Sequence, residues 1–122
     1  MTIHNVTNLS IDDFLVEEQQ YLKPKGNYRA AFVLFKAEWC PHCIRFSDTF
    51  LQLASMFPDV MFGVVDSEED RDLLKKIQDT PNTAYKVDGF PMIVLYKNGK
   101  VQKIAKERDL VSLQKELNDL LL

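Results

Sequence analysis

Cysteine and glycine are scarce in this sequence, and both shortages limit the classes of protein to which it can belong. Two cysteines among 122 residues are too few for a secreted scaffold held together by disulfides. Four glycines are few for a chain with long irregular segments, so compact, regular elements are expected. The chain also shows no internal repeat and no low-complexity tract. At this length we expect a single domain spanning residues 1–122.

Two further absences bear on location and partners. No segment contains the run of about eighteen apolar residues that a membrane span needs, and residues 1–7 lack the basic and apolar regions of a signal peptide. With 15 Lys and Arg against 18 Asp and Glu, the net charge of −3 gives no overall attraction to nucleic acid or to an anionic membrane. We therefore predict a cytoplasmic protein that binds neither nucleic acid nor membrane.

Hydrophobic periodicity predicts an alternation of strands and helices. The apolar spacing typical of strands occurs at residues 3–6, 31–35, 60–65, 92–96 and 101–105. Helical spacing occurs at residues 10–22, 40–57, 67–77 and 110–121. Ser10 with Asp13 is a capping signal for the first of these helices and Asp109 for the last, while the acidic residues 68–70 are interpreted as the first turn of the third.

The order of these elements predicts the fold class. Two strands joined by the helix at residues 40–57 form a parallel βαβ unit, and Asn98-Gly99 between two apolar runs indicates a type I′ hairpin. We therefore predict an α/β fold with a central mixed sheet of about five strands and helices on both faces.

Cys40 and Cys43 lie three residues apart at the start of the predicted second helix. The unsatisfied N–H groups and the positive end of the helix dipole favour a thiolate at Cys40. Because the thiolate is the nucleophile in disulfide exchange, Cys40 is the candidate attacking group and Cys43 the candidate resolving group. Pro41 suits the first turn, where a missing N–H costs nothing.

Three other interpretations of the cysteines were weighed. A structural disulfide across so short a loop would restrict the unfolded chain very little. A metal site needs about four ligands, whereas His42 lies within the same turn and His4 is remote, so we expect no metal. Two inert buried cysteines are the strongest alternative, and the strand-to-helix context favours the redox pair.

Residues 37–43 read AEWCPHC, which resembles the active-site segment of thioredoxins, and the Pro41-His42 dipeptide is similar to that of the DsbA-type oxidases. Segments at 65–66, 85–91 and 96–99 follow in thioredoxin order, so the resemblance covers roughly residues 30 to 121. It implies a thioredoxin fold and a cis peptide bond between Phe90 and Pro91. In that family this loop contacts the cysteines and offers backbone hydrogen bonds to an extended substrate segment.

The sequence departs from the family at positions that matter for proton transfer. Thioredoxins usually carry a buried acid where this chain has Leu34, and the accompanying lysine corresponds to Phe62. We therefore predict slow deprotonation of Cys43, unless solvent or Glu38 substitutes for the missing acid. A kinking proline, frequent in the family's second helix, is replaced by Asp48.

Three further features beside the cysteines each have a functional interpretation and one without a function. A cationic His42 near Cys40 would stabilise the thiolate and make the pair more oxidising, although His42 could be an ordinary solvated residue. Trp39 is expected to lie beside the site and supply apolar contact area, with a core position as the alternative. The charged residues Lys103, Lys106, Glu107 and Arg108 replace a small, glycine-containing turn of the family, and if they border the site they would make partner choice more polar and salt-dependent.

These observations predict a thiol-disulfide oxidoreductase that needs no cofactor and acts as a monomer. Its partners would be proteins carrying disulfides or dithiols, with a recycling reductase or glutathione, and a reducing compartment favours net reduction. Two alternatives stay open. One is an oxidase or isomerase like DsbA, and the other is a protein-binding adaptor that uses the groove around Trp39, Phe90 and Pro91.

Overall fold

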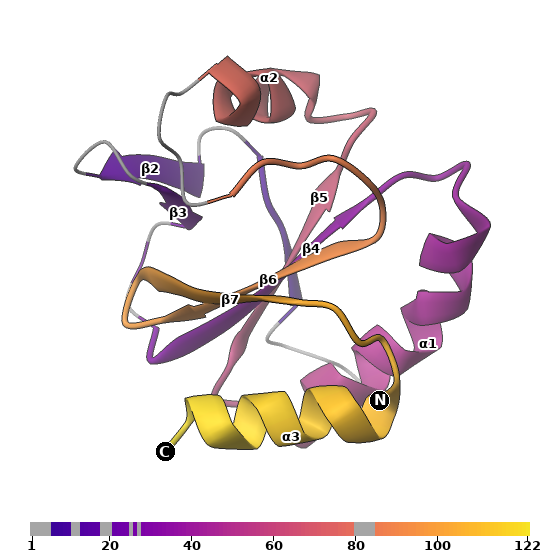
Figure 1. The fold of residues 1–122 in the computed structure, drawn as a ribbon, viewed down its shortest axis with the longest axis vertical. Helices are drawn as coiled ribbons and strands as arrows, with labels where there is room; N and C mark the ends of the chain where they lie inside the picture. The colour runs from indigo at the N-terminus through magenta and orange to yellow at the C-terminus, as the bar shows by residue number, and fades with distance from the viewer. Residues whose placement is uncertain (1–5, 11–12, 18–20, 25, 27, 80–84) are drawn as a thin grey trace.

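The computed structural model of the chain describes residues 6–10, 13–17, 21–24, 26, 28–79 and 85–122 (Figure 1). The strands are β1 (Val6–Asn8), β2 (Phe14–Glu17), β3 (Tyr21–Pro24), β4 (Ala30–Lys36), β5 (Met61–Asp66), β6 (Met92–Lys97) and β7 (Lys100–Ala105). The helices are α1 (Pro41–Met56), α2 (Arg71–Asp79) and α3 (Leu110–Leu120).

The central sheet has five strands in the order β1-β5-β4-β6-β7. β5 runs parallel to both β1 and β4, whereas β6 is antiparallel to β4 and β7. Helices α1 and α3 lie on one side of this sheet and α2 on the other (Figure 1). The predicted mixed sheet, with its parallel βαβ unit, its antiparallel hairpin and helices on both faces, is thus confirmed.

Strand β4 is buried on both faces, because its alternate side chains enter two separate cores. Phe32 and Leu34 point toward α1 and α3, and Val33 and Phe35 toward α2. Phe32 lies 5.1 Å from the ring of Phe62, measured between centroids. Burial of each such ring contributes about 2–3 kcal/mol, so β4 is a rigid support for the segment that follows it.

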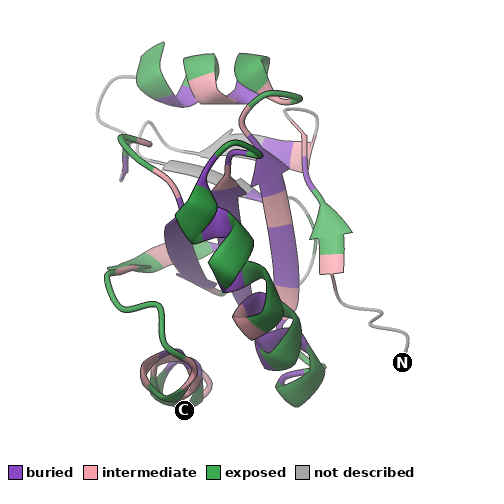
Figure 2. Ribbon diagram, turned by 90° about the vertical axis from the view of Figure 1, so that its right-hand side faces the viewer, coloured by how far each residue is buried: buried purple, intermediate pink, exposed green. Residues whose placement is uncertain are grey.

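Helix α1 presents one apolar face to the sheet and leaves the opposite face to solvent (Figure 2). Its buried side chains recur at three and four residues and are Cys43, Phe46, Phe50, Leu53 and Ala54. The helix ends at Met56, before Pro58, and its bounds agree with the predicted helix at residues 40–57.

The helix predicted at residues 10–22 is wrong for the described residues. Ser10 does bond to Asp13, its N–H lying 2.9 Å from Oδ2, but the chain then extends into β2. β2 and β3 form a two-stranded antiparallel sheet, and β3 lies beside β7. Helical spacing over so short a segment is ambiguous, and pairing between strands with this long-range contact decides in favour of the extended form.

Two smaller expectations concern the first strand and the acidic residues beside α2. β1 occupies Val6–Asn8, whereas most of the strand expected at residues 3–6 lies outside the described residues. The acidic residues 68–70 precede α2 instead of forming its first turn, so that interpretation is wrong. Asp66 causes the difference, because its Oδ1 accepts hydrogen bonds from the backbone N–H groups of Glu68 (2.9 Å) and Glu69 (3.3 Å) and closes a turn there.

The C-terminal elements follow the prediction closely. Asn98 (φ 52°) and Gly99 (φ 80°) both have positive φ, as a type I′ turn requires. Asp109 caps α3, its Oδ2 accepting a hydrogen bond of 2.9 Å from the N–H of Ser112.

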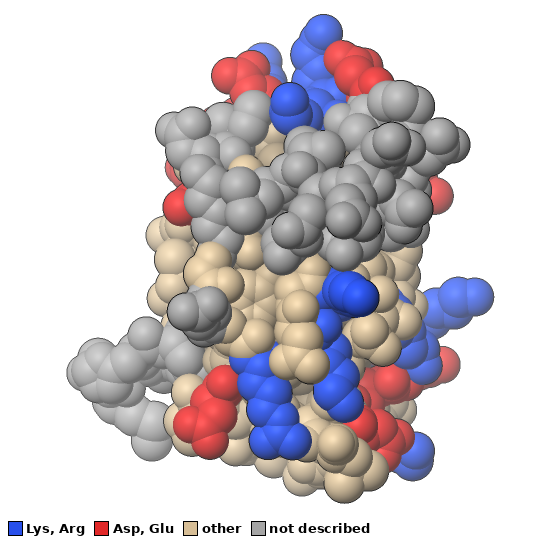
Figure 3. All heavy atoms as spheres, turned by 90° about the vertical axis from the view of Figure 1, so that its left-hand side faces the viewer, with Lys and Arg blue, Asp and Glu red and all other residues tan. Residues whose placement is uncertain are grey.

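The surface on the face that lies to the left in Figure 1 carries charges of both signs. Figure 3 shows Lys and Arg beside Asp and Glu on this face, with uncharged residues between them. Within the described residues, every helix is too short or too polar to traverse a bilayer.

Candidate active site

Cys40 lies in the connection between the buried strand β4 and α1, immediately before the first residue of the helix. Its backbone is extended (φ −88°, ψ 113°), and its Sγ accepts a hydrogen bond of 3.4 Å from the backbone N–H of Cys43. Cys40 is therefore the N-cap of α1, Pro41 occupies the first turn, and Cys43 follows on the same turn. The sequence placed both cysteines inside the first turn, and the structure moves Cys40 one position outward, to the cap.

The two cysteines share a small apolar cluster with one residue that follows β4 and one that precedes β6. Both are free thiols and both are nearly buried, Cys40 being 4% and Cys43 5% exposed. They cluster with Ala37 and Phe90. The Cys40 thiol donates to the carbonyl oxygen of Phe90 at 3.5 Å. The bond between Phe90 and the buried Pro91 is cis.

Trp39 flanks this cluster on the surface. Its side chain is 67% exposed, which excludes the core position weighed from the sequence. Its ring meets that of Phe90 edge to face, with centroids 6.2 Å apart and an interplanar angle of 86°. An apolar aromatic surface therefore lies directly beside Cys40.

The environment of Cys40 favours its thiolate. Burial raises the pKa of Cys40, but hydrogen bonds from the Cys43 thiol and from the backbone N–H groups of Cys43 and His42 lower it, as does the positive charge of Arg108. The lowering effects prevail, so the pKa of Cys40 lies below its ordinary value.

The environment of Cys43 favours its thiol. Burial raises the pKa of Cys43, and the thiol of Cys40 raises it further. A backbone hydrogen bond from Ala37 and the charge of Arg108 act in the opposite direction without cancelling that increase. The pair is therefore asymmetric, with the more acidic sulfur at the cap and the less acidic one inside the helix.

His42 acts on this geometry through its backbone. Its N–H helps to lower the pKa of Cys40, whereas its exposed ring accepts a hydrogen bond at Nδ1 from the guanidinium of Arg45. Arg108 is a positively charged side chain that the structure adds to this environment, and it lowers the pKa of both cysteines.

Sequence reasoning missed Arg45 and placed Arg108 only conditionally. Arg45 lies three residues after His42 on the same helix, a spacing that brings the two side chains together. Arg108 belongs to the charged segment considered from the sequence, and it reaches the site, because it lies against His42 in one pocket. With His42, Phe46 and Thr49 these arginines line a pocket of about 180 Å³.

A larger cavity of about 560 Å³ has Cys43 on its wall. Leu34 lines it in place of the acid usual in the family, so no carboxylate of β4 reaches Cys43 there. The polar residues on its wall are Asn8, Lys36, Glu38, Ser47 and Asp48. Glu38, the substitute base considered from the sequence, is among them, and Asp48 is a second carboxylate that the sequence did not suggest for this task.

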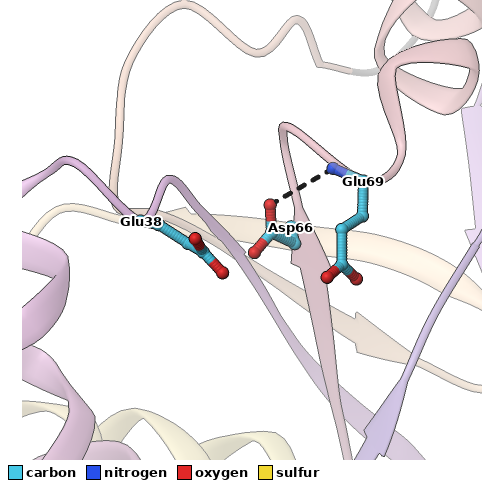
Figure 4. Close-up of side chains that lie close together, drawn as sticks. All are labelled: Glu38, Asp66 and Glu69. Carbon is cyan, nitrogen blue, oxygen red and sulfur yellow. Dashed lines mark hydrogen bonds between the residues drawn. The ribbon is translucent and has the colours of Figure 1, made fainter.

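Three carboxylates gather beside the site, on Glu38, Asp66 and Glu69 (Figure 4). Their ligand atoms lie within 4.8 Å of one another. Asp66 comes from the end of β5, and its Oδ1 already accepts the backbone N–H of Glu69, which gives it a structural role in the turn.

Comparison with known proteins agrees with this geometry. The thioredoxin family model matches residues 16–119. A thioredoxin of Geodia cydonium is 33% identical over 81 residues, covering 66% of this chain and 68% of that protein. Protein disulfide isomerase-like 2-1 of Oryza sativa subsp. japonica is 31% identical over 101 residues, covering 80% of this chain but only 25% of that protein.

The structural match extends over the whole chain. The crystal structure of thioredoxin Mala s 13 from Malassezia sympodialis superposes with a TM-score of 0.69 at 19% identity, covering 100% of this chain and 96% of that one. Mitochondrial thioredoxin 3 of Saccharomyces cerevisiae superposes with a TM-score of 0.60 at 25% identity, covering 75% and 79%. From its family match, its fold and its paired cysteines, the chain belongs to the thioredoxin family of thiol-disulfide oxidoreductases.

Proposed function

We propose that the chain reduces disulfides in other proteins, with Cys40 as nucleophile and Cys43 as resolving thiol. The observation that carries this assignment is the asymmetry of the pair. The pKa of Cys40 is lowered at the helix cap, while that of Cys43 is raised. Because only a thiolate attacks a disulfide, the reaction begins at Cys40.

The reaction proceeds in two exchanges. The Cys40 thiolate attacks one sulfur of the substrate disulfide, forms a mixed disulfide and releases the first substrate thiolate. Cys43 then loses its proton and attacks Sγ of Cys40, which releases the second substrate thiolate and leaves a disulfide between Cys40 and Cys43. The substrate gains two electrons and the pair loses two, and a dithiol reductase or glutathione returns them.

The surroundings of the pair support recognition of an extended protein segment. Trp39 and Phe90 offer an aromatic surface beside Cys40, and the backbone near Pro91 is suited to hydrogen bonding with a strand-like substrate. We propose that the substrate binds in the groove formed by Trp39, Phe90 and Pro91. Pro41 and His42 contribute by forming the first turn of α1, which follows the cap residue Cys40.

Insulin reduction in the presence of dithiothreitol tests the proposal. The unmodified chain is expected to accelerate the turbidity caused by the freed insulin B chain, and Cys40→Ser is expected to abolish that acceleration. Cys43→Ser is expected to retain the first exchange and accumulate a mixed disulfide, which mass spectrometry detects. Equal turbidity rates for the unmodified chain and Cys40→Ser would contradict the proposal and leave the adaptor alternative.

The direction of the reaction depends on the reduction potential of the pair. We propose net reduction in a reducing compartment such as the cytoplasm, with the chain acting as a monomer. Equilibration with glutathione mixtures measures the potential, and a value on the oxidising side of the cytosolic glutathione pool would favour the oxidase alternative suggested by the Pro41-His42 dipeptide.

A further inference from the structure

Two arginines near the active-site turn have no carboxylate partner among the described residues. Arg45 projects from α1, and Arg108 lies in the segment between β7 and α3. The ion pairs found among the described residues are Lys75–Asp79, Lys103–Glu116 and Lys115–Asp119. Neither arginine takes part in them, although acidic residues outnumber basic ones in the chain.

These two side chains converge on one pocket. It measures about 180 Å³, and His42, Phe46 and Thr49 complete its wall. The hydrogen bond from Arg45 to Nδ1 of His42 orients the first guanidinium along the helix. A pocket of this size accommodates a carboxylate-bearing side chain.

The pocket adjoins the active-site turn, because His42, which lies between Cys40 and Cys43 in the sequence, forms part of its wall. A group bound there is therefore near the turn at which a substrate disulfide is attacked. Guanidinium groups bind carboxylates through paired, charge-assisted hydrogen bonds, and a second guanidinium reinforces such a contact.

We propose that Arg45 and Arg108 form a subsite for a carboxylate carried close to the substrate disulfide, so that the chain prefers disulfides flanked by acidic groups. This inference rests on the proposed oxidoreductase function. The carboxylate can belong to an aspartate or glutamate of a substrate protein or to glutathione, and the two sources are separated by experiment.

The test compares matched substrates. One pair is a peptide disulfide with glutamate beside the cysteine and the same peptide with glutamine, and the other is glutathione disulfide and its ethyl ester. The kcat/KM ratio of the acidic to the neutral substrate is measured for the unmodified chain, Arg45→Gln and Arg108→Gln. Lys100→Gln is the matched control, because it removes one positive charge at the hairpin, at the opposite end of β6 from Pro91.

The unmodified chain is expected to prefer the acidic substrate, and each arginine substitution to lower that ratio by roughly 1.5- to 5-fold, as for a solvent-exposed ion pair. Lys100→Gln is expected to leave the ratio unchanged. Because the ratio cancels any effect of Arg108 on the reactivity of Cys40, a change in it reports binding of the carboxylate. A loss confined to the peptide pair assigns the site to acidic proteins, and one confined to the glutathione pair assigns it to glutathione.

A ratio close to one for both substrate pairs, or one that neither arginine substitution alters, would overturn the subsite and leave the oxidoreductase activity standing. Failure of the unmodified chain to reduce any of the four substrates, with insulin reduction retained, would overturn the subsite alone, whereas loss of insulin reduction as well would overturn the proposed function.

Discussion

Replacing Leu34 with aspartate restores the acid that the family usually carries behind the resolving cysteine. Leu34 is 4% exposed and lines the cavity of about 560 Å³ that also borders Cys43. Loss of a buried leucine side chain costs about 2–5 kcal/mol, and burial of a carboxyl group adds about 1–3 kcal/mol. The polar wall and solvent access of the cavity offset part of that cost, so we expect a destabilisation of about 3–5 kcal/mol.

The same substitution is expected to accelerate resolution. A carboxylate facing the cavity can accept the proton of Cys43, and general base catalysis of this kind typically contributes about 100-fold or more. Stopped-flow measurement of mixed-disulfide decay gives the resolution rate, and urea unfolding gives the stability. Burial raises the pKa of the introduced carboxyl, so its ionisation destabilises the fold, and the stability penalty should grow as the pH rises through that pKa.

Leu34→Asn is the matched control, because it has nearly the same shape and the same loss of apolar contact but cannot accept a proton. The reasoning predicts that both variants lose stability and that only Leu34→Asp resolves mixed disulfides faster than the unmodified chain. Equal resolution rates for the two variants would refute it and would mean that a group already on the cavity wall, such as Glu38 or Asp48, performs this proton transfer.

Three further outcomes follow from the same structure. Arg108→Gln is expected to raise the pKa of Cys40, which thiolate absorbance measured against pH would detect, while Lys100→Gln leaves it unchanged; an unaltered titration in Arg108→Gln would exclude its charge as an activator. Tyr96→Phe removes the buried hydrogen bond of 2.8 Å between the hydroxyls of Tyr85 and Tyr96 and should lower the free energy of unfolding by about 1 kcal/mol, with no loss in urea titration counting against that bond. Burial, with the nearby charges of Asp66 and Asp13, raises the pKa of Asp70, so its ionisation destabilises the folded state as the pH rises; Asp70→Asn should therefore add about 0.5 kcal/mol near neutral pH and nothing in acid, and equal gains at both would contradict this origin.

The elements that the sequence predicted well are those in which a local signal reinforces the apolar pattern. Helix α1 has Pro41 at its start and Pro58 after its end, the β6–β7 turn has Asn98-Gly99, and α3 has Asp109 as its cap. The segment containing β2 and β3 lacks such agreement. The hydrogen bond between Ser10 and Asp13 forms, yet the segment is extended and not helical. The reason is that β2 and β3 pair with each other in the folded chain.

The candidate site was predictable to the extent that neighbours in sequence are neighbours in space. Cys40, Cys43 and Trp39 belong to one short segment, and the family resemblance brought Phe90 and Pro91 to it. Arg45 and Asp48 face different pockets from the same helix, and their assignment depends on which side chains from other elements meet them. Arg108 is separated from Cys40 in sequence by β5, β6 and β7, so only tertiary structure shows that its charge acts on the sulfur.

Because the sulfur of Cys40 is also the acceptor that caps α1, the start of this helix is coupled to the chemistry of the site. An anionic sulfur is a stronger hydrogen-bond acceptor than a sulfur bonded to another sulfur. Each turnover therefore alternately strengthens and weakens this capping hydrogen bond, and in the oxidised protein the disulfide between Cys40 and Cys43 links the cap to the first turn instead. The hydrogen-exchange rate of the Cys43 amide would therefore report the redox state of the pair.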